Sequence, residues 1–137
     1  MTEPQLHPLT VHGIVQQDEQ EGPILVLVDD LARPLLIPIG LCESRAIQFI
    51  LEKQSSPRPL THDLFVVLAE QCDASVSRVI IDDYSGGTFY ARLMLNGADG
   101  PVSLDCRPSD GVAIALHAGA PMFVTATLME SLPTDKE

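Results

Sequence analysis

Alternation of apolar and polar residues with a period of two is the strongest folding signal in this chain. Every second residue from Phe89 to Leu95 is apolar and faces the same side, which is the pattern of a strand with one buried face. Ser85-Gly86-Gly87 precedes this strand and Asn96-Gly97 follows it, and such residues form the tight turns that join antiparallel strands. The segment therefore requires a fold that contains an antiparallel sheet.

Shorter apolar runs predict further strands, and three other segments have the helical period instead. The other predicted strands are Leu9–Gln16, Ile24–Val28, Leu35–Ile39, Val76–Asp82, Val102–Arg107 and Met122–Thr125. The predicted helices are about Cys42–Gln54, Thr61–Cys72 and Pro108–Gly119. This order of elements predicts an α/β (α+β) domain with a mixed, largely antiparallel sheet and about three helices.

The starts and buried faces of the helices are predicted from side-chain type. Thr61 and Ser109 have the hydroxyl groups that commonly cap helix N-termini. Val112–Leu116 is apolar on all sides, so the third helix is expected to be deeply buried. The second helix is expected to turn four residues inward: Leu64, Phe65, Leu68 and Ala69.

A chain of 137 residues fits one domain, with a core over about 11–128 and flexible ends at 1–8 and 131–137. The N-terminus lacks the apolar run of a signal peptide, and no segment approaches the ~20 apolar residues that cross a bilayer. We therefore expect a cytoplasmic protein without a membrane partner. Three cysteines, far apart and without a C-x-x-C pair, predict free thiols: Cys42, Cys72 and Cys106.

Net charge limits the ways in which this chain can bind nucleic acid. Eight Lys and Arg stand against nineteen Asp and Glu, which gives a net charge of −11. Sequence-independent affinity for phosphates comes from basic residues that release counterions, so the composition argues against casual nucleic-acid binding. A nucleic-acid partner would need a local basic groove or bridging metal ions.

Two short clusters, Arg58–Asp63 and Asp105–Asp110, carry the candidate chemistry. Both contain Arg-Pro, then a hydroxyl residue and an aspartate at the start of a helix. A structural interpretation is available, because Asp63 and Asp110 would each stabilise a helix by ~0.3–1 kcal/mol through the helix dipole. The arginine of each cluster could then pair with the acid of the other.

The functional interpretation is phosphodiester hydrolysis, which needs a group that generates hydroxide and positive charge beside the phosphoryl oxygens. Mg²⁺ prefers one or two carboxylates with waters and substrate phosphates, and three aspartates could supply those carboxylates. His62 could act as a general base or a metal ligand, and Arg58 or Arg107 could make bidentate hydrogen bonds to the phosphate. Alternation along the predicted strand places Asp105 and Arg107 on the same side.

Four segments in the same order closely resemble the bifunctional nuclease family. They read "LLIPIGLCESRAI" (35–47), "RPLTHDL" (58–64), "VIIDDYSGGTFYARLML" (79–95) and "DCRPSDGVAIAL" (105–116), the last followed by "GAPMFV" (119–124). The resemblance covers about Val11–Leu128. One departure is Gly111, which stands where the family usually has alanine and which weakens a helix interior by up to ~1 kcal/mol.

The resemblance implies an α/β domain of its own fold that assembles into homo-oligomers. For plant members it also implies a nuclease that acts on both DNA and RNA. The family's motif positions are all present here: Glu43, Arg58, Thr61, His62, Asp63, Asp82, Tyr90, Asp105, Arg107, Ser109 and Asp110.

These patterns together define the candidate site. The predicted catalytic residues are His62, Asp63, Asp105, Arg107 and Asp110. The predicted substrate-binding residues are Arg58, Thr61 and Ser109, and the predicted ligands of Mg²⁺ or Mn²⁺ are Glu43, Asp63, Asp105 and Asp110. We expect metal-dependent hydrolysis of DNA or RNA with low sequence specificity. Two alternatives stay open: a non-catalytic homo-oligomeric binding or regulatory module, and a hydrolase of a small phosphorylated metabolite.

Overall fold

The computed structural model describes residues 4–16, 20–54 and 56–133, and this part of the chain forms one compact α+β domain. It contains four helices and a seven-stranded sheet, which confirms the predicted fold class. In chain order the elements are β1 (Leu6–Gln16), β2 (Pro23–Asp29), β3 (Pro34–Pro38), α1 (Leu41–Leu51), α2 (Thr61–Gln71), β4 (Ser75–Ser85), β5 (Thr88–Gly97), β6 (Gly100–Cys106), α3 (Pro108–Ala118), β7 (Met122–Thr125) and α4 (Ala126–Ser131).

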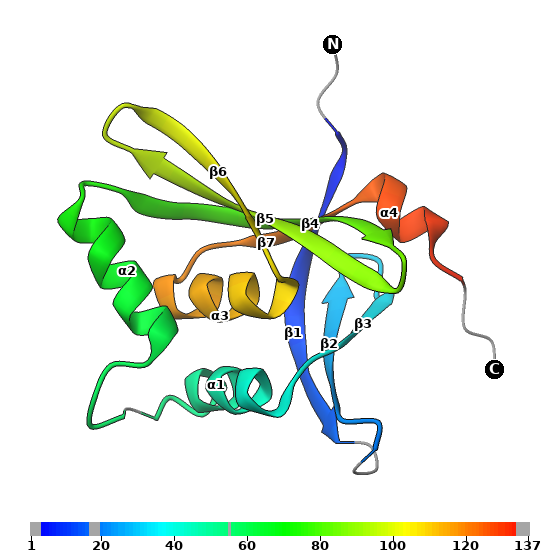
Figure 1. Ribbon diagram of the computed structural model, residues 1–137. Helices are drawn as coiled ribbons and strands as arrows, with labels where there is room; N and C mark the ends of the chain where they lie inside the picture. Colours follow the sequence, from blue (N-terminus) through cyan, green and yellow to red (C-terminus); the bar gives the residue numbers. More distant parts are fainter. Residues whose placement is uncertain (1–3, 17–19, 55, 134–137) are drawn as a thin grey trace.

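The sheet consists of two antiparallel three-stranded units joined by the short strand β7 (Figure 1). Its order is β3-β2-β1-β7-β4-β5-β6, and every pair is antiparallel except β4 with β7. The predicted turn between β4 and β5 is confirmed, because Gly86 and Gly87 both adopt positive φ angles of 61° and 81°. L-residues with side chains rarely adopt this conformation, which explains the glycine pair.

Helix α3 lies at the centre of the domain and holds the helical layer to the sheet. It packs on β4 and β5 and contacts both α1 and α2. Val112–Ala115 are all buried, as the apolar run predicts. The helix ends at Gly119, whose φ of 72° is the left-handed conformation that terminates helices. The N-terminal turns of α1, α2 and α3 are therefore fixed by a shared core.

The predicted inward face of α2 is wrong at two positions. Leu64 and Leu68 are 60% and 61% exposed, whereas His62 and Val66 are buried. Apolar residues occur on several sides of this helix, so the sequence pattern does not distinguish its faces. Contact with α3 selects the side that carries His62 and leaves the leucines outside.

Helix starts also differ from the predicted caps. Leu60 is the N-cap of α2 and Arg107 is the N-cap of α3, so Thr61 and Pro108 are already the first helical residues. Proline suits that first position because its missing N–H has no partner there in any case. Strand β6 ends at Cys106, so Arg107 does not share a strand face with Asp105 as predicted.

The predicted ends of the domain lie partly outside the described residues. Within the described part, β1 begins at Leu6 and its first residues pair with β7. Helix α4 continues through Ser131. Residues 6–8 and Ser131 therefore belong to regular elements, and the flexibility predicted for 1–8 and 131–137 stays a prediction.

Candidate functional site

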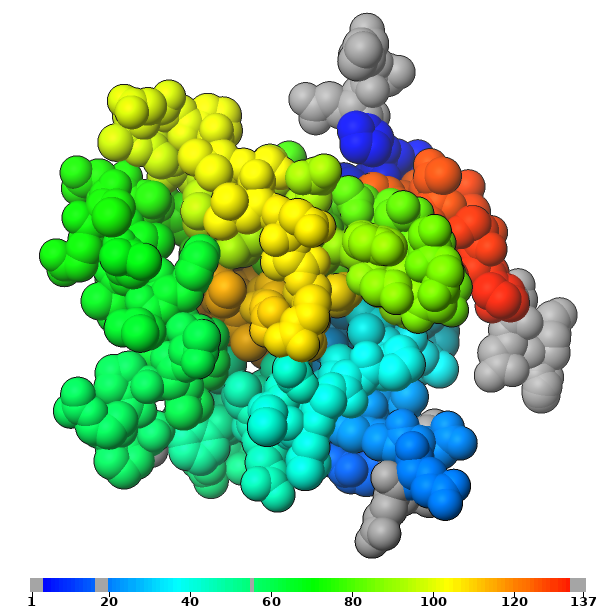
Figure 2. All heavy atoms as spheres, in the orientation of Figure 1, coloured from blue at the N-terminus to red at the C-terminus, as the bar shows by residue number. Residues whose placement is uncertain are grey.

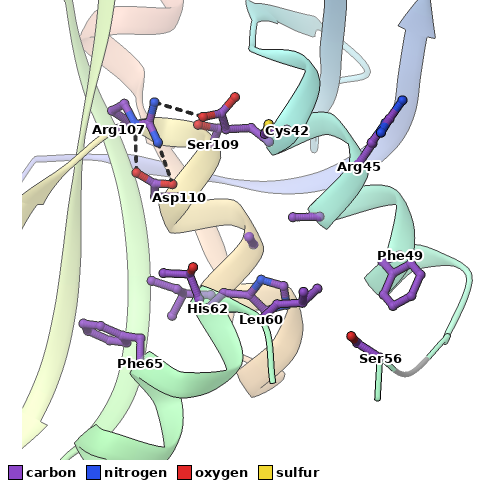
Figure 3. Close-up of a pocket in the computed structure, with 15 residues that line it drawn as sticks. Cys42, Arg45, Phe49, Ser56, Leu60, His62, Phe65, Arg107, Ser109 and Asp110 are labelled. Carbon is purple, nitrogen blue, oxygen red and sulfur yellow. Dashed lines mark hydrogen bonds and ion pairs between the residues drawn. The ribbon is translucent and has the colours of Figure 1, made fainter. Parts of the chain in front are cut away.

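A cavity of about 770 Å³ lies between α1, α2 and α3, and both Arg-Pro clusters reach it (Figure 3). The first cluster contributes Thr61 and His62, and the second contributes Arg107, Ser109 and Asp110. The clusters are more than forty residues apart in sequence, and they meet because α2 packs against α3 beside the cavity. Together with Glu43, six of the nine candidate site residues therefore share one site.

Arg107 is held at the cavity wall by two carboxylates. Its Nε and Nη2 donate to the two Asp110 oxygens at 2.8 and 3.1 Å, and its Nη1 lies 3.1 Å from Glu43 Oε2. Both acids occupy first helical turns, where the helix dipole favours negative charge. The guanidinium pairs with the acid of its own cluster and with α1, and not with Asp63.

His62 is the buried titratable group of the cavity wall. Its residue is 8% exposed, and burial lowers the pKa of its imidazole, opposed by the nearby Asp63 carboxylate and assisted by His117. The imidazole is therefore neutral at pH 7 and can accept a proton.

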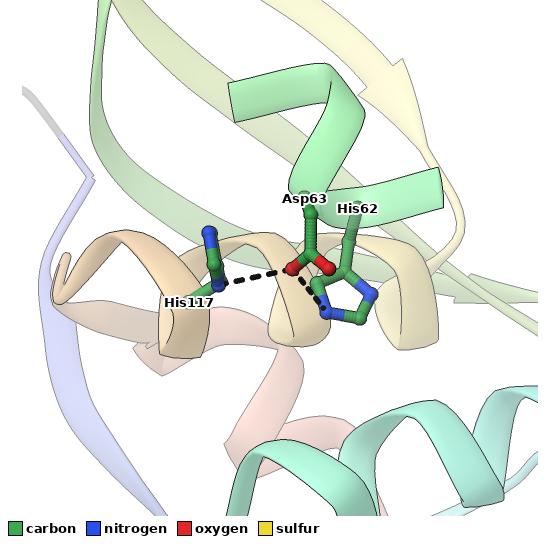
Figure 4. A group of neighbouring side chains, drawn as sticks. All are labelled: His62, Asp63 and His117. Carbon is green, nitrogen blue, oxygen red and sulfur yellow. Dashed lines mark ion pairs between the residues drawn. The ribbon is translucent and has the colours of Figure 1, made fainter. Parts of the chain in front are cut away.

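Asp63 does not line the cavity but bridges two histidines beside it (Figure 4). Its Oδ1 lies 3.1 Å from His62 Nε2 and 3.2 Å from His117 Nδ1. Its Oδ2 accepts a hydrogen bond of 2.8 Å from the Leu60 backbone N–H, which caps α2. One carboxylate thus ties the start of α2 to the end of α3.

Two further predicted site residues lie outside the cavity wall. Asp105 is exposed on the edge strand β6, where it pairs in register with Arg92. Its charge contributes to the raised pKa of Asp82, although burial of Asp82 is the larger cause. Arg58 is exposed ahead of α2 and does not contribute to the wall of the cavity. Their predicted roles remain predictions.

The four predicted metal-binding carboxylates do not form a single set of oxygen ligands. Arg107 already lies between Glu43 and Asp110, Asp63 faces two imidazoles, and Asp105 is on the far strand. Among the described residues, three or more potential ligands converge in two places. These groups are His62, Asp63 and His117, and separately His7, Asp29 and Asp30. The predicted carboxylates therefore do not fit one Mg²⁺ site.

Sequence reasoning did not identify His117 or the apolar walls of the cavity. His117 is seven residues after Asp110 on α3, so two helical turns place both on one face, and this spacing was the available signal. Phe49 and Phe65 come from α1 and α2 and line the cavity with Leu60 and Ile114. Their inward direction depends on how the helices pack.

A mixed seven-stranded sheet and three helices whose first turns line one cavity define an α+β domain with a single candidate site for both Arg-Pro clusters. The chain matches the bifunctional nuclease domain over residues 24–137 and belongs to that family. None of the described helices is long and apolar enough to cross a membrane.

Relatives of the chain come from bacteria and plants. Two Mycobacterium tuberculosis proteins, "Uncharacterized protein MT1877" (strain CDC 1551 / Oshkosh) and "Uncharacterized protein Rv1829" (strain H37Rv), are each 39% identical over 121 residues. The match covers 87% of this chain and 71% of each relative. "Bifunctional nuclease 1" of Oryza sativa subsp. indica is 29% identical over 105 residues, which are 73% of this chain and 32% of the rice protein.

Proposed function

We propose that this chain is a nuclease that hydrolyses phosphodiester bonds of DNA or RNA at the cavity between α1, α2 and α3. The observation that carries the proposal is that the two Arg-Pro clusters contribute polar side chains to one cavity. Membership of the bifunctional nuclease domain family supports the reaction class.

Arg107 and the hydroxyl groups would bind the phosphate. A guanidinium has five N–H bonds, and three of them face Asp110 and Glu43, which leaves two for a phosphoryl oxygen. The two carboxylates hold the planar group in place before substrate arrives. Ser109 and Thr61 line the same cavity with hydroxyl groups that can donate to phosphate oxygens.

His62 would accept the proton of the attacking water. Its imidazole is neutral, and the Asp63 carboxylate lies 3.1 Å from Nε2, where it stabilises the imidazolium that forms. The second ring nitrogen is turned away from Asp63 (Figure 4) and is the atom available to the substrate side.

Apolar side chains account for the proposed low sequence specificity. Phe49 and Phe65 line the cavity, and aromatic rings stack on any base without reading its hydrogen-bonding edge. A net charge of −11 leaves few basic residues for phosphate contacts, so we expect affinity for nucleic acid to fall only shallowly with salt.

The test is cleavage of labelled single-stranded and double-stranded DNA and RNA by purified protein in Mg²⁺, Mn²⁺ or EDTA. We expect His62→Gln to lower the rate by ~10²–10⁴ and Arg92→Gln, outside the cavity, to leave it unchanged. Activity that elutes with the protein and stops in EDTA would also support the proposed metal dependence. Wild-type cleavage by folded His62→Gln protein would refute this use of the cavity.

A non-catalytic binding or regulatory module is the second candidate. The observation in its favour is that two carboxylates already neutralise Arg107 in a cavity that is otherwise largely apolar. Binding of labelled strands without cleavage in any metal would select this function. Turnover of small phosphate esters without action on nucleic acid would select the metabolite hydrolase instead.

Self-association is also proposed, and the outer face of α2 supports it. Leu64, Val67 and Leu68 are 60%, 47% and 61% exposed there. Apolar side chains gathered on one helix face are typical of surfaces that another subunit covers.

A further inference from the structure

We propose that His62, Asp63 and His117 form a binding site for a first-row transition metal ion such as Zn²⁺. Three ligand atoms converge there from α2 and α3: two imidazole nitrogens and one carboxylate oxygen, all within 4.8 Å of one another. The site lies beside the cavity and shares only His62 with its wall. Binding of the ion does not depend on the proposed nuclease activity, and an ion on His62 Nε2 would exclude the proton-acceptor role of His62 while it is bound.

The spacing of the ligand atoms fits an ion between them. Two ligands about 2.1 Å from a metal lie about 3.0 Å apart at a right angle and about 3.4 Å apart at the tetrahedral angle. Asp63 Oδ1 is 3.1 Å from His62 Nε2 and 3.2 Å from His117 Nδ1, within that range. The ion could therefore enter with small side-chain rotations.

The two histidine contacts differ from an ordinary histidine–aspartate pair elsewhere in the chain. His7 Nδ1 makes a hydrogen bond of 2.9 Å with Asp30. The contacts of His62 and His117 with Asp63 are of similar length but lack hydrogen-bond geometry. The rings are inclined by 68° with centroids 5.5 Å apart, so they meet the carboxylate from two directions. This arrangement suits ligation of a shared ion.

The ligand types select the metal. Imidazole nitrogen is a good ligand for Zn²⁺, Co²⁺ and Ni²⁺, whereas Mg²⁺ prefers oxygen ligands throughout. The carboxylate ligand carries a charge of about −1, which a divalent cation overcompensates. The negative charge of the whole chain raises the local concentration of cations further.

The surroundings hold two ligands in place and leave the third side open. The Leu60 N–H fixes Asp63 through its second oxygen, in the way that outer contacts orient metal ligands. His62 is buried, whereas His117 is 37% exposed. An ion at this position would keep coordination positions for water, as accessible zinc sites do.

The experiment is a titration of tag-free, EDTA-treated full chain with Zn²⁺, in competition with a chromophoric chelator, and with Co²⁺ followed by visible absorption. We expect one ion per chain and weakening by ~100-fold or more in His117→Ala, which removes a half-exposed ligand. Asp63→Asn should weaken binding as well. His7→Ala, which removes the other histidine paired with an aspartate, should leave affinity unchanged.

Three results would overturn the proposal. The first is unchanged Zn²⁺ affinity in folded His117→Ala and Asp63→Asn proteins. The second is an intense thiolate-to-Co²⁺ band, which would assign the ion to the exposed cysteines Cys42 and Cys72 instead. The third is displacement of Zn²⁺ by equimolar Mg²⁺, which would contradict imidazole ligation. Circular dichroism of each variant identifies loss of folding separately, and the nuclease assay is not needed for any of these outcomes.

Discussion

Replacement of Arg107 by Gln tests whether Arg107 serves mainly in structural ion pairs or binds the phosphate of the substrate. The Arg107 side chain is 64% exposed, and its partners Asp110 and Glu43 are 47% and 23% exposed. Exposed pairs of this kind contribute at most ~1 kcal/mol each. Both carboxylates keep the stabilisation of a helix N-terminus when the arginine is removed. Because Arg107 makes two such pairs, we expect Arg107→Gln to lower the free energy of unfolding by no more than about 2 kcal/mol.

The expected effect on cleavage is far larger. Loss of a positioned donor to a developing negative charge slows catalysis by ~10²–10³. The assay measures single-turnover cleavage of a labelled strand and the urea midpoint on the same preparation of Arg107→Gln. Arg92→Gln is the matched control, since Arg92 is half exposed and pairs with Asp82 outside the cavity. Wild-type cleavage by folded Arg107→Gln would refute phosphate binding by this residue, and a loss above ~3 kcal/mol would refute the exposed-pair estimate.

Three further predictions follow from the burial or exposure of particular side chains. Burial, with nearby carboxylates, raises the pKa of Cys106 to about 11, so a thiol reagent at pH 7.5 should modify the exposed Cys42 and Cys72 quickly and Cys106 only on unfolding. Folding lowers the pKa of His62, so the unfolded chain binds more protons than the folded chain below pH ~6.5. The melting temperature should therefore fall as the pH drops below that value. This fall should be less steep in His62→Gln. If the outer face of α2 mediates self-association, Leu68→Glu should reduce the mass measured by light scattering to that of a monomer of 14.8 kDa. The melting temperature should not change. A monomeric wild-type protein would contradict self-association.

Local sequence patterns were sufficient for the strands and for most turns. The alternation in Phe89–Leu95 corresponds to β5, and its glycine-rich neighbour corresponds to the turn at Gly86 and Gly87. Such features depend on residues close in sequence, so their physical cause is visible in the sequence itself. The convergence of the two Arg-Pro clusters was partly predictable, because both begin helices.

The remainder of the site depends on packing between distant elements. Which face of α2 is buried depends on α3, and the apolar pattern of α2 alone fits more than one face. The contact of His117 with Asp63 joins residues 54 positions apart, and no local signal specifies such a distance. The dispersal of the predicted carboxylates has the same origin, since Asp105 belongs to a strand edge and Asp110 to a helix start.

Gly111 shows how packing can reverse a prediction made from helix propensity. In the fourth position of α3, Gly111→Ala should gain up to ~1 kcal/mol from propensity alone. A Cβ at this position, however, would lie 3.0 Å from Val79 Cγ1 and 3.2 Å from Cys106 Sγ. Val79 is fully buried and β-branched, so its side chain has little freedom to move.

Overpacking of a tight core costs ~1–3 kcal/mol, which exceeds the gain from propensity. We therefore expect Gly111→Ala to destabilise the domain by about 1 kcal/mol, measured from urea midpoints. The same substitution in a Val79→Ala background should stabilise that background, because the methyl group then occupies the space that Val79 vacates. A higher midpoint for Gly111→Ala alone would show that β4 yields to the added methyl group, and that the close approach of α3 to the sheet does not require glycine.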